Sequence, residues 1–158
     1  MSEGMEKCSI VVFSGDMDKM IAAFIIATTA AAMGRETSMF FTFWGVKAIQ
    51  KGNLTGESFL ERMLGLMNRG GIDRIGPSRF NFGGIGRWMF KKMMKDKGVT
   101  SLAELREMAI DLGVKFLACD MSMDVMGISR EDLIDEVADV VGAATYCSNA
   151  LEGQALFI

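Results

Sequence analysis

Histidine is absent from this chain of 158 residues, and proline occurs once, at Pro77. Without histidine the protein has no Ser–His–Asp triad, no histidine general base and no histidine metal ligand. Three cysteines are present, Cys8, Cys119 and Cys147, an odd number of distant residues without a Cys-x-x-Cys pair. This spacing disfavours both a disulfide framework and a structural zinc site. We therefore expect no metal and no bound cofactor.

Long apolar runs are also missing. The longest, residues 20–33, has 14 residues, whereas a membrane-spanning helix needs about 20. The start of the chain is polar and shows no signal peptide, so we expect a cytoplasmic protein. The net charge of -3 and a pI of about 5.0 argue against nucleic-acid binding.

Hydrophobic periodicity predicts an α/β protein formed by a single domain over residues 1–158. Short apolar runs predict strands at 7–13, 36–43, 114–119, 138–141 and 154–158. Helices are predicted at 17–33, 44–51, 58–68, 101–112, 120–126, 130–136 and 145–152. The first strand, helix and strand fit into fewer than about 40 residues, which is typical of a βαβ unit and a parallel sheet. We expect an open, mostly parallel sheet with helices on both faces.

The first predicted helix, residues 17–33, is dense in Ala, Ile and Met. A helix that is apolar nearly all round is expected to be buried. Asp16 precedes it in the position of a capping residue. Serine and glutamate at capping-box spacing, Ser58 with Glu61 and Ser101 with Glu104, mark the starts of two further helices.

The middle of the chain, about residues 69–98, differs from the rest and is predicted to be an irregular, glycine-rich, basic insertion. It contains eight basic and two acidic residues, a formal charge of +6 that leaves -9 elsewhere. Its aromatic and basic residues Arg87, Trp88, Lys91 and Lys92 suggest contact with a partner protein or a membrane surface; the alternative is a solvated helix face. Its glycines do not form a phosphate loop, because no strand directly precedes them and no Gly-Lys-Ser/Thr follows.

Ligands of open α/β sheets bind beyond the carboxyl ends of the strands. Three segments lie at such ends, and they supply the candidate pocket residues Ser14, Gly15, Asp16, Asp18, Trp44, Gly45, Asp120, Met121 and Ser122. Cys119 is the only cysteine among these segments. A thiol just before a helix faces unpaired N–H groups, which favour the nucleophilic thiolate, although the charge of Asp120 opposes this. The alternative is a buried structural cysteine.

A functional role is less well supported for the other two cysteines. Cys147 lies near the start of a predicted helix, and is either a second sulfur site, a resolving thiol or a packing residue. Cys8 lies among apolar strand neighbours and is expected to be structural.

Three sequence blocks resemble the DsrE/DsrF-like family, and more narrowly its peroxiredoxin-like DsrE-type branch. They are SGDMDK at 14–19 followed by AAFIIA, MFFTFWG at 39–45, and CDMSMDVMGI at 119–128. The resemblance covers nearly the whole chain. It implies a three-layer α/β/α fold with a mainly parallel, five-stranded sheet and a tendency to form homo-oligomers. The name peroxiredoxin-like does not imply peroxidase activity.

The resemblance also implies a sulfur carrier or sulfurtransferase in which Cys119 accepts sulfane sulfur, as a persulfide or thiosulfonate, and relays it between protein partners. Backbone N–H groups near Gly15 and Met121 are candidates to hold the sulfur-borne negative charge. Two alternatives stay open. One is a non-catalytic binding or scaffold subunit with a structural Cys119, and the other is a membrane-peripheral adaptor.

Overall fold

The sheet is parallel throughout, as the sequence predicts. The computed structural model describes residues 6–150 and 153–158. Five strands, β1 (Lys7–Val12), β2 (Glu36–Phe41), β3 (Lys115–Cys119), β4 (Val137–Val141) and β5 (Gly153–Phe157), are arranged in the order β4-β3-β2-β1-β5. Each neighbouring pair runs parallel, so the carboxyl ends of all five strands meet at one edge.

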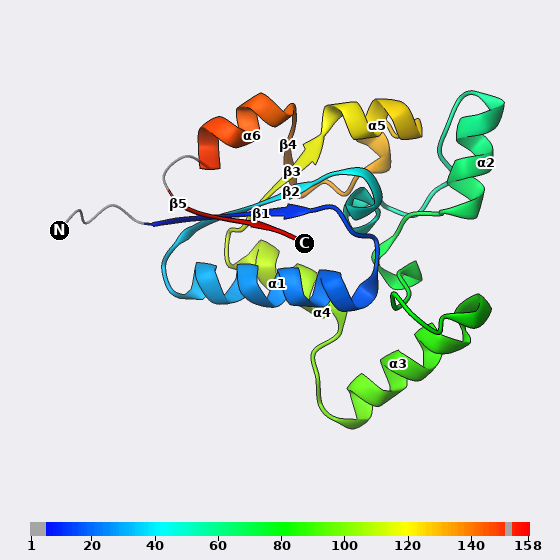
Figure 1. The fold of residues 1–158 in the computed structure, drawn as a ribbon, viewed down its shortest axis with the longest axis horizontal. Coiled ribbons are helices and arrows are strands. Elements are labelled where there is room, and N and C mark those ends of the chain that lie inside the picture. Colours follow the sequence, from blue (N-terminus) through cyan, green and yellow to red (C-terminus); the bar gives the residue numbers. More distant parts are fainter. Residues whose placement is uncertain (1–5, 151–152) are drawn as a thin grey trace.

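Helices cover both faces of this sheet (Figure 1). On one face lie α1 (Met17–Ala32) and α4 (Leu102–Asp111), and on the other lie α5 (Asp120–Met126) and α6 (Ala143–Ala150). Two more helices, α2 (Phe59–Met67) and α3 (Ile85–Asp96), extend beyond the carboxyl ends of the strands. Short 3-10 helices connect these elements: η1 (Phe43–Ile49), η2 (Ile72–Arg74), η3 (Phe82–Gly84) and η4 (Arg130–Asp132). This confirms the three-layer α/β/α architecture.

The two faces of the sheet have different cores, because side chains alternate along each strand. The larger core lies against α1 and α4, where the rings of Phe24, Phe41 and Phe116 meet at centroid distances of 5.4 to 6.2 Å. The smaller one, on the opposite face, contains four buried residues: Phe40, Leu117, Cys119 and Tyr146. Alternation along β3 thus places Phe116 in the large core and Cys119 in the small one.

Several sequence predictions need correction. Helix α1 is not buried all round: Ile25 and Ile26 face solvent, because the sheet covers only one side of the helix. Asp16 occupies the N-cap position of α1 but makes no side-chain capping bond. The 69–98 segment is not irregular throughout, since α3 forms within it, and the helix predicted at 130–136 shortens to η4.

The remaining predicted elements form within a few residues of their expected bounds. The end of the last predicted helix, Glu152, lies outside the described residues. Both predicted capping boxes are present, at Ser58–Glu61 and Ser101–Glu104. Of the helices in the described residues, none combines the length and the apolarity that crossing a bilayer would require.

Candidate functional site

Cys119 is the last residue of β3 and the N-cap residue of α5, so it lies at the carboxyl edge of the sheet. Its side chain is only 4% exposed. It belongs to the small core beneath α6, where the ring of Tyr146 stacks on Phe40 at a centroid distance of 4.9 Å. Tyr146 is the only buried residue of α6. Helix α6 therefore reaches this small core mainly through one aromatic side chain, Tyr146.

The residues that follow Cys119 are already engaged with the chain itself. The exposed Asp120 accepts a hydrogen bond from the Met121 backbone N–H at 2.6 Å, and Met121 points its side chain into solvent. Ser122 is fully buried, and its hydroxyl pairs with that of Thr42 at 2.8 Å. The Ser122 hydroxyl therefore ties α5 to Thr42, just after β2, whereas the Asp120 carboxylate bonds within α5.

The other two cysteines lie in contrasting environments. Cys147 is exposed on α6. Cys8 is completely buried in the large core, and this burial raises the pKa of its thiol. Burial likewise raises the pKa of Tyr146, whose hydroxyl has no hydrogen-bond partner among the described residues.

Four of the predicted pocket residues do come together at the carboxyl ends of β1 and β2. They line a cleft of about 390 Å³. Its lining consists of Phe13, Ser14, Gly15, Asp16, Lys19, Trp44, Lys47, Asn68, Arg74, Gly76, Pro77 and Asn81. Gly45 lies beneath it, packed on the backbone of Val12. Cys119 and the three residues after it are not part of this lining, so the predicted pocket residues divide between two places.

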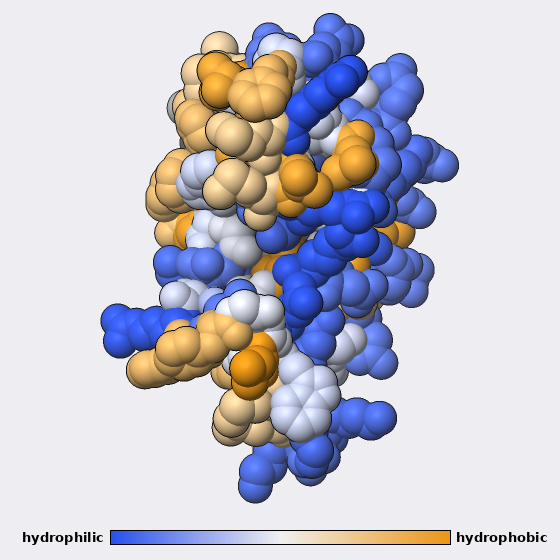
Figure 2. Space-filling view, turned by 90° about the vertical axis from the view of Figure 1, so that its right-hand side faces the viewer, coloured by the Kyte–Doolittle hydropathy of each residue, from blue (hydrophilic) through white to orange (hydrophobic). Residues whose placement is uncertain are grey.

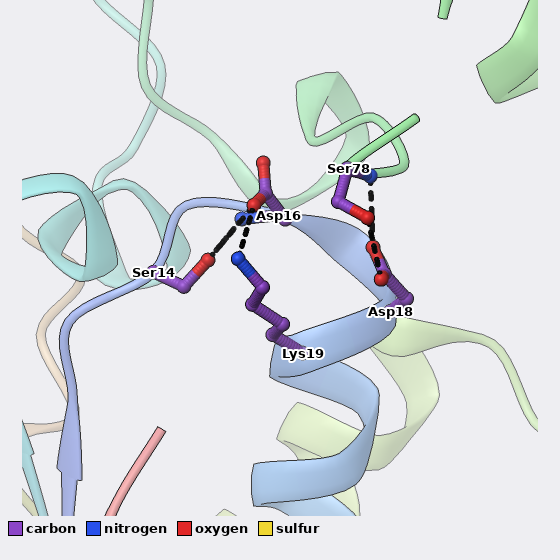
Figure 3. Close-up of polar contacts among 5 residues, drawn as sticks. All are labelled: Ser14, Asp16, Asp18, Lys19 and Ser78. Atoms are coloured by element: carbon purple, nitrogen blue, oxygen red, sulfur yellow. Dashed lines mark hydrogen bonds and ion pairs between the residues drawn. The ribbon is translucent and has the colours of Figure 1, made fainter. Parts of the chain in front are cut away.

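The acidic residues at the start of α1 point in different directions (Figure 3). Asp16 turns into the cleft, where it accepts hydrogen bonds from Ser14 at 3.1 Å and from Lys19 at 3.0 Å. Asp18 turns away and accepts two bonds from Ser78, at 2.8 and 2.7 Å. Burial acts to raise the pKa of Asp18, but the bonds from Ser78 outweigh it, and the pKa is lowered. Asp18 therefore anchors the loop before α3.

Two backbone N–H groups at this helix start already have partners. The Asp16 N–H donates to the Ser14 hydroxyl at 3.2 Å, and the Met17 N–H donates to the Gly76 carbonyl at 2.8 Å. The lining of the cleft also includes cations, which are able to bind negative charge.

Sequence reasoning did not place any of the three cations of the cleft in the pocket: Lys19 on α1, Lys47 on η1 and Arg74 on η2. Lys47 is half-buried, and its Nζ donates a long 3.4 Å bond to Asn68. Burial lowers the pKa of Lys47, and the neighbouring charges of Arg87 and Arg74 lower it further. The only available signal was the position of Lys47 after the second strand, because Arg74 reaches the cleft only through tertiary folding.

The predicted partner surface is exposed on α3. Trp88 is 64% exposed, and the Lys92 ammonium pairs with Asp96 at 3.2 Å. Lys91 donates to the Asp73 backbone carbonyl, and Arg87 to that of Arg74, both at 2.9 Å. Figure 2 shows apolar patches on this side of the molecule, with hydrophilic side chains between them. The exposed apolar residues of α3 and the loop before it are Phe80, Phe82, Ile85, Trp88, Met89 and Met93.

No metal site is evident: nowhere in residues 6–150 and 153–158 do three Cys, Asp or Glu side chains gather in a way that could hold an ion.

The sequence of this chain is similar to that of known proteins. The profile of the DsrE/DsrF/DrsH-like family matches residues 4–158. The chain belongs to this family. It is 45% identical to the uncharacterized protein YrkE of Bacillus subtilis over 161 residues, with all of both chains covered. It is also 35% identical to the sulfur carrier protein DsrE2 of Allochromatium vinosum over 150 residues, which cover 89% of this chain and 90% of DsrE2.

A solved structure supports the fold of this DsrE-like chain. The ychN protein from E. coli superposes with a TM-score of 0.60 over 98% of this chain and 100% of its own, at 15% identity. At that level of identity the likeness concerns the fold alone.

Proposed function

We propose that this protein is a sulfur carrier that binds sulfane sulfur on Cys119 and relays it to a partner protein. The observation that carries the proposal is the 35% identity to the sulfur carrier DsrE2 along nearly the whole chain. Cys119 supports it, since it is the thiol at the carboxyl edge of the parallel sheet, where this class of fold binds ligands.

The chemistry requires only a thiol and a donor. The Cys119 thiolate attacks the outer sulfur of a donor persulfide, a new S–S bond forms at Cys119, and the donor leaves as its own thiolate. A partner thiolate then attacks the outer sulfur in the same way and restores Cys119. Neither step changes the total number of electrons, so no metal or redox cofactor is needed.

The burial of Cys119 fits a carrier that protects its load. A thiol only 4% exposed cannot meet a donor unless its cover opens, and we infer that this cover is α6, whose Tyr146 shares the small core with Cys119. Opening of α6 would admit the donor, and closure would shield the persulfide from water and stray thiols. A donor or acceptor that displaces α6 would therefore control loading.

Intact mass spectrometry tests the proposal. The wild-type protein, incubated with a persulfide donor and freed of excess reagent, is expected to gain the mass of one sulfur atom, and Cys119→Ser to gain none. Cys147→Ser is the matched control and should still load, because Cys147 lies on the exposed side of α6. Loading of Cys119→Ser to the wild-type level would refute the proposal.

The burial of Cys119 also favours a second candidate function, a non-catalytic binding or scaffold subunit with a structural cysteine. Alkylation separates the two. If iodoacetamide leaves Cys119 unmodified in the native protein while Cys147 reacts, and partner binding persists in Cys119→Ser, the scaffold function holds.

The exposed surface of α3 supports a peripheral contact with a membrane or a partner protein. Arg87, Lys91 and Lys92 lie on the same helix as the exposed Trp88, and a mixture of basic and aromatic side chains suits anionic lipid. Sedimentation with phosphatidylserine vesicles at low salt tests the membrane contact, with neutral vesicles as the control. Failure to sediment would argue against the membrane contact and leave contact with a partner protein as the proposed role of this surface.

A homo-oligomer is also proposed, on the basis of exposed apolar side chains on α2. Phe59, Leu60 and Met67 lie largely in solvent, and only Gly65 of this helix is buried. Exposure on this scale is typical of an interaction surface. Analytical ultracentrifugation of the wild type and of Phe59→Ser would measure the oligomeric state and its dependence on this surface.

A further inference from the structure

Cations outnumber anions in the cleft at the carboxyl ends of β1 and β2. Lys19, Lys47 and Arg74 line it, against one carboxylate, Asp16. Asp16 is already paired with Lys19 at 3.0 Å. Within residues 6–150 and 153–158, neither Lys47 nor Arg74 forms an ion pair with a carboxylate. Lys47 and Arg74 thus form no direct salt bridge there, and Asp16, whose charge also acts on Lys47, is shared with Lys19.

Arg87 is a third cation near Lys47 and Arg74. The guanidinium of Arg87 is held by the Arg74 carbonyl at 2.9 Å, and the charges of both arginines lower the pKa of Lys47. Two guanidinium charges held near the half-buried ammonium of Lys47 destabilise the fold. Such an arrangement is typical of a binding site, where a ligand supplies the missing charge.

The chain holds these cations on a rigid frame. Lys47 lies between two fully buried residues, Val46 and Ala48. Arg74 is followed by Ile75, which is also fully buried, and the Gly71 N–H of the same segment donates to the Lys47 carbonyl at 3.1 Å. The backbone that carries both side chains is therefore fixed before any ligand arrives, which lowers the entropic cost of binding.

We propose that this cleft binds a small tetrahedral oxyanion between Lys47 and Arg74, with Arg87 adding to the positive potential and the amides of Asn68 and Asn81 lining the same space. A dianion would neutralise both unpaired cations, and a guanidinium with an ammonium suits tetrahedral oxygens. The cleft of about 390 Å³ also has room for a larger group attached to the anion. The same chemistry is offered by oxyanions of sulfur, such as thiosulfate and sulfite, and by phosphate.

Calorimetric titration at constant ionic strength tests the site, with thiosulfate, sulfite, sulfate and phosphate as separate probes. We expect saturable 1:1 binding of at least one of them. Lys47→Met and Arg74→Gln should each weaken it by about tenfold or more, since each removes a charge-assisted contact. Lys92→Gln is the matched control, because Lys92 lies on α3, pairs with Asp96 and does not line the cleft.

The probes also assign the source of the ligand. Preference for thiosulfate or sulfite over sulfate and phosphate supports a site for a sulfur-bearing anion, and preference for phosphate supports a site for a phosphorylated compound. If no probe binds at millimolar concentration, or if Lys47→Met and Arg74→Gln bind like the wild type, the proposal is refuted.

Two controls keep the result interpretable. Lys47→Met should melt at the wild-type temperature or above it, because it removes charge repulsion, and a bound anion should raise the melting temperature of the wild type alone. Binding should persist in Cys119→Ser, since Cys119 does not line the cleft. Failure of the anion site and failure of sulfur loading on Cys119 are therefore separate outcomes.

Discussion

At the scale of single residues, Gly45 is required by a close approach of two backbone segments. A Cβ atom at this position would lie 1.9 Å from the Val12 carbonyl oxygen, and backbone cannot swing aside as a side chain can. We expect Gly45→Ala to lower the free energy of unfolding by about 2 kcal/mol or more. Gly142→Ala is the control, because the nearest atom there would lie at 3.5 Å. Urea denaturation measures both, and equal stability of the two variants would contradict the argument.

Tyr146 contributes its ring but not its hydroxyl. The ring stacks on Phe40, whereas the buried hydroxyl has no partner among the described residues. We expect Tyr146→Phe to match or exceed the wild type in stability by up to about 1 kcal/mol, since an unsatisfied polar group is removed. Tyr146→Ala should be less stable and should speed alkylation of Cys119, because α6 loses its only buried side chain. Unchanged alkylation in Tyr146→Ala would show that α6 is not the cover of the thiol.

At the scale of secondary structure elements, the same capping motif is expected to contribute differently to global stability in two helices. Ser101 and Ser58 each accept a hydrogen bond from the backbone N–H of a glutamate three residues later. Helix α4 buries Leu102, Leu105 and Ala109, while α2 buries only Gly65. Ser101→Ala should therefore lower global stability by about 1 kcal/mol.

Ser58→Ala should act locally instead. Helix α2 buries little, so it is expected to unfold separately from the rest of the protein at a small free-energy cost. Losing the cap lowers only this local stability, and hydrogen exchange should therefore accelerate in α2 and not in the sheet. A global loss as large as that of Ser101→Ala would show that α2 is coupled to the core.

At the scale of the whole molecule, the lack of histidine shapes the pH dependence of stability. Several carboxylates, including Asp18 and Asp132, have a lowered pKa: burial acts to raise it, but hydrogen bonds from Ser78 and Ser129 respectively outweigh this effect. A lowered pKa in the folded state contributes stability above the unfolded pKa, about 4, and this is lost as the pH falls through the folded value. Stability should be flat between about pH 5.5 and 7 and fall in acid.

Urea denaturation across this range checks that prediction. Asp18→Asn should show a smaller fall in acid than the wild type, because its side chain no longer titrates. A steep change near pH 6.5 would contradict the prediction, since no side chain of ordinary pKa titrates there in a chain without histidine.

Most of the fold could be predicted from the sequence. The strand-like runs at 7–13 and 114–119 and the capping serines Ser58 and Ser101 are local signals, and the structure confirms them because local propensity and tertiary packing agree. Helix α3 was foreseen only as the alternative of a solvated helix face, because its glycine-rich start hides the pattern. The helix predicted at 130–136 ends early because Leu133 pairs with Gln50 in an antiparallel bridge and the Ile134 N–H donates to the Ile49 carbonyl.

From the amino-acid sequence alone follow the mostly parallel sheet, the place of Cys119 at its carboxyl edge and the absence of histidine chemistry. Tertiary folding is needed to show that Cys119 faces the small core that Tyr146 of α6 also enters, because a period of two assigns each side chain to one face of the sheet, and the packing of helices settles what lies on that face. It also brought together Lys47, Arg74 and Arg87 from three separate segments. Contacts between distant residues depend on how the chain packs, and no local pattern in the sequence records them.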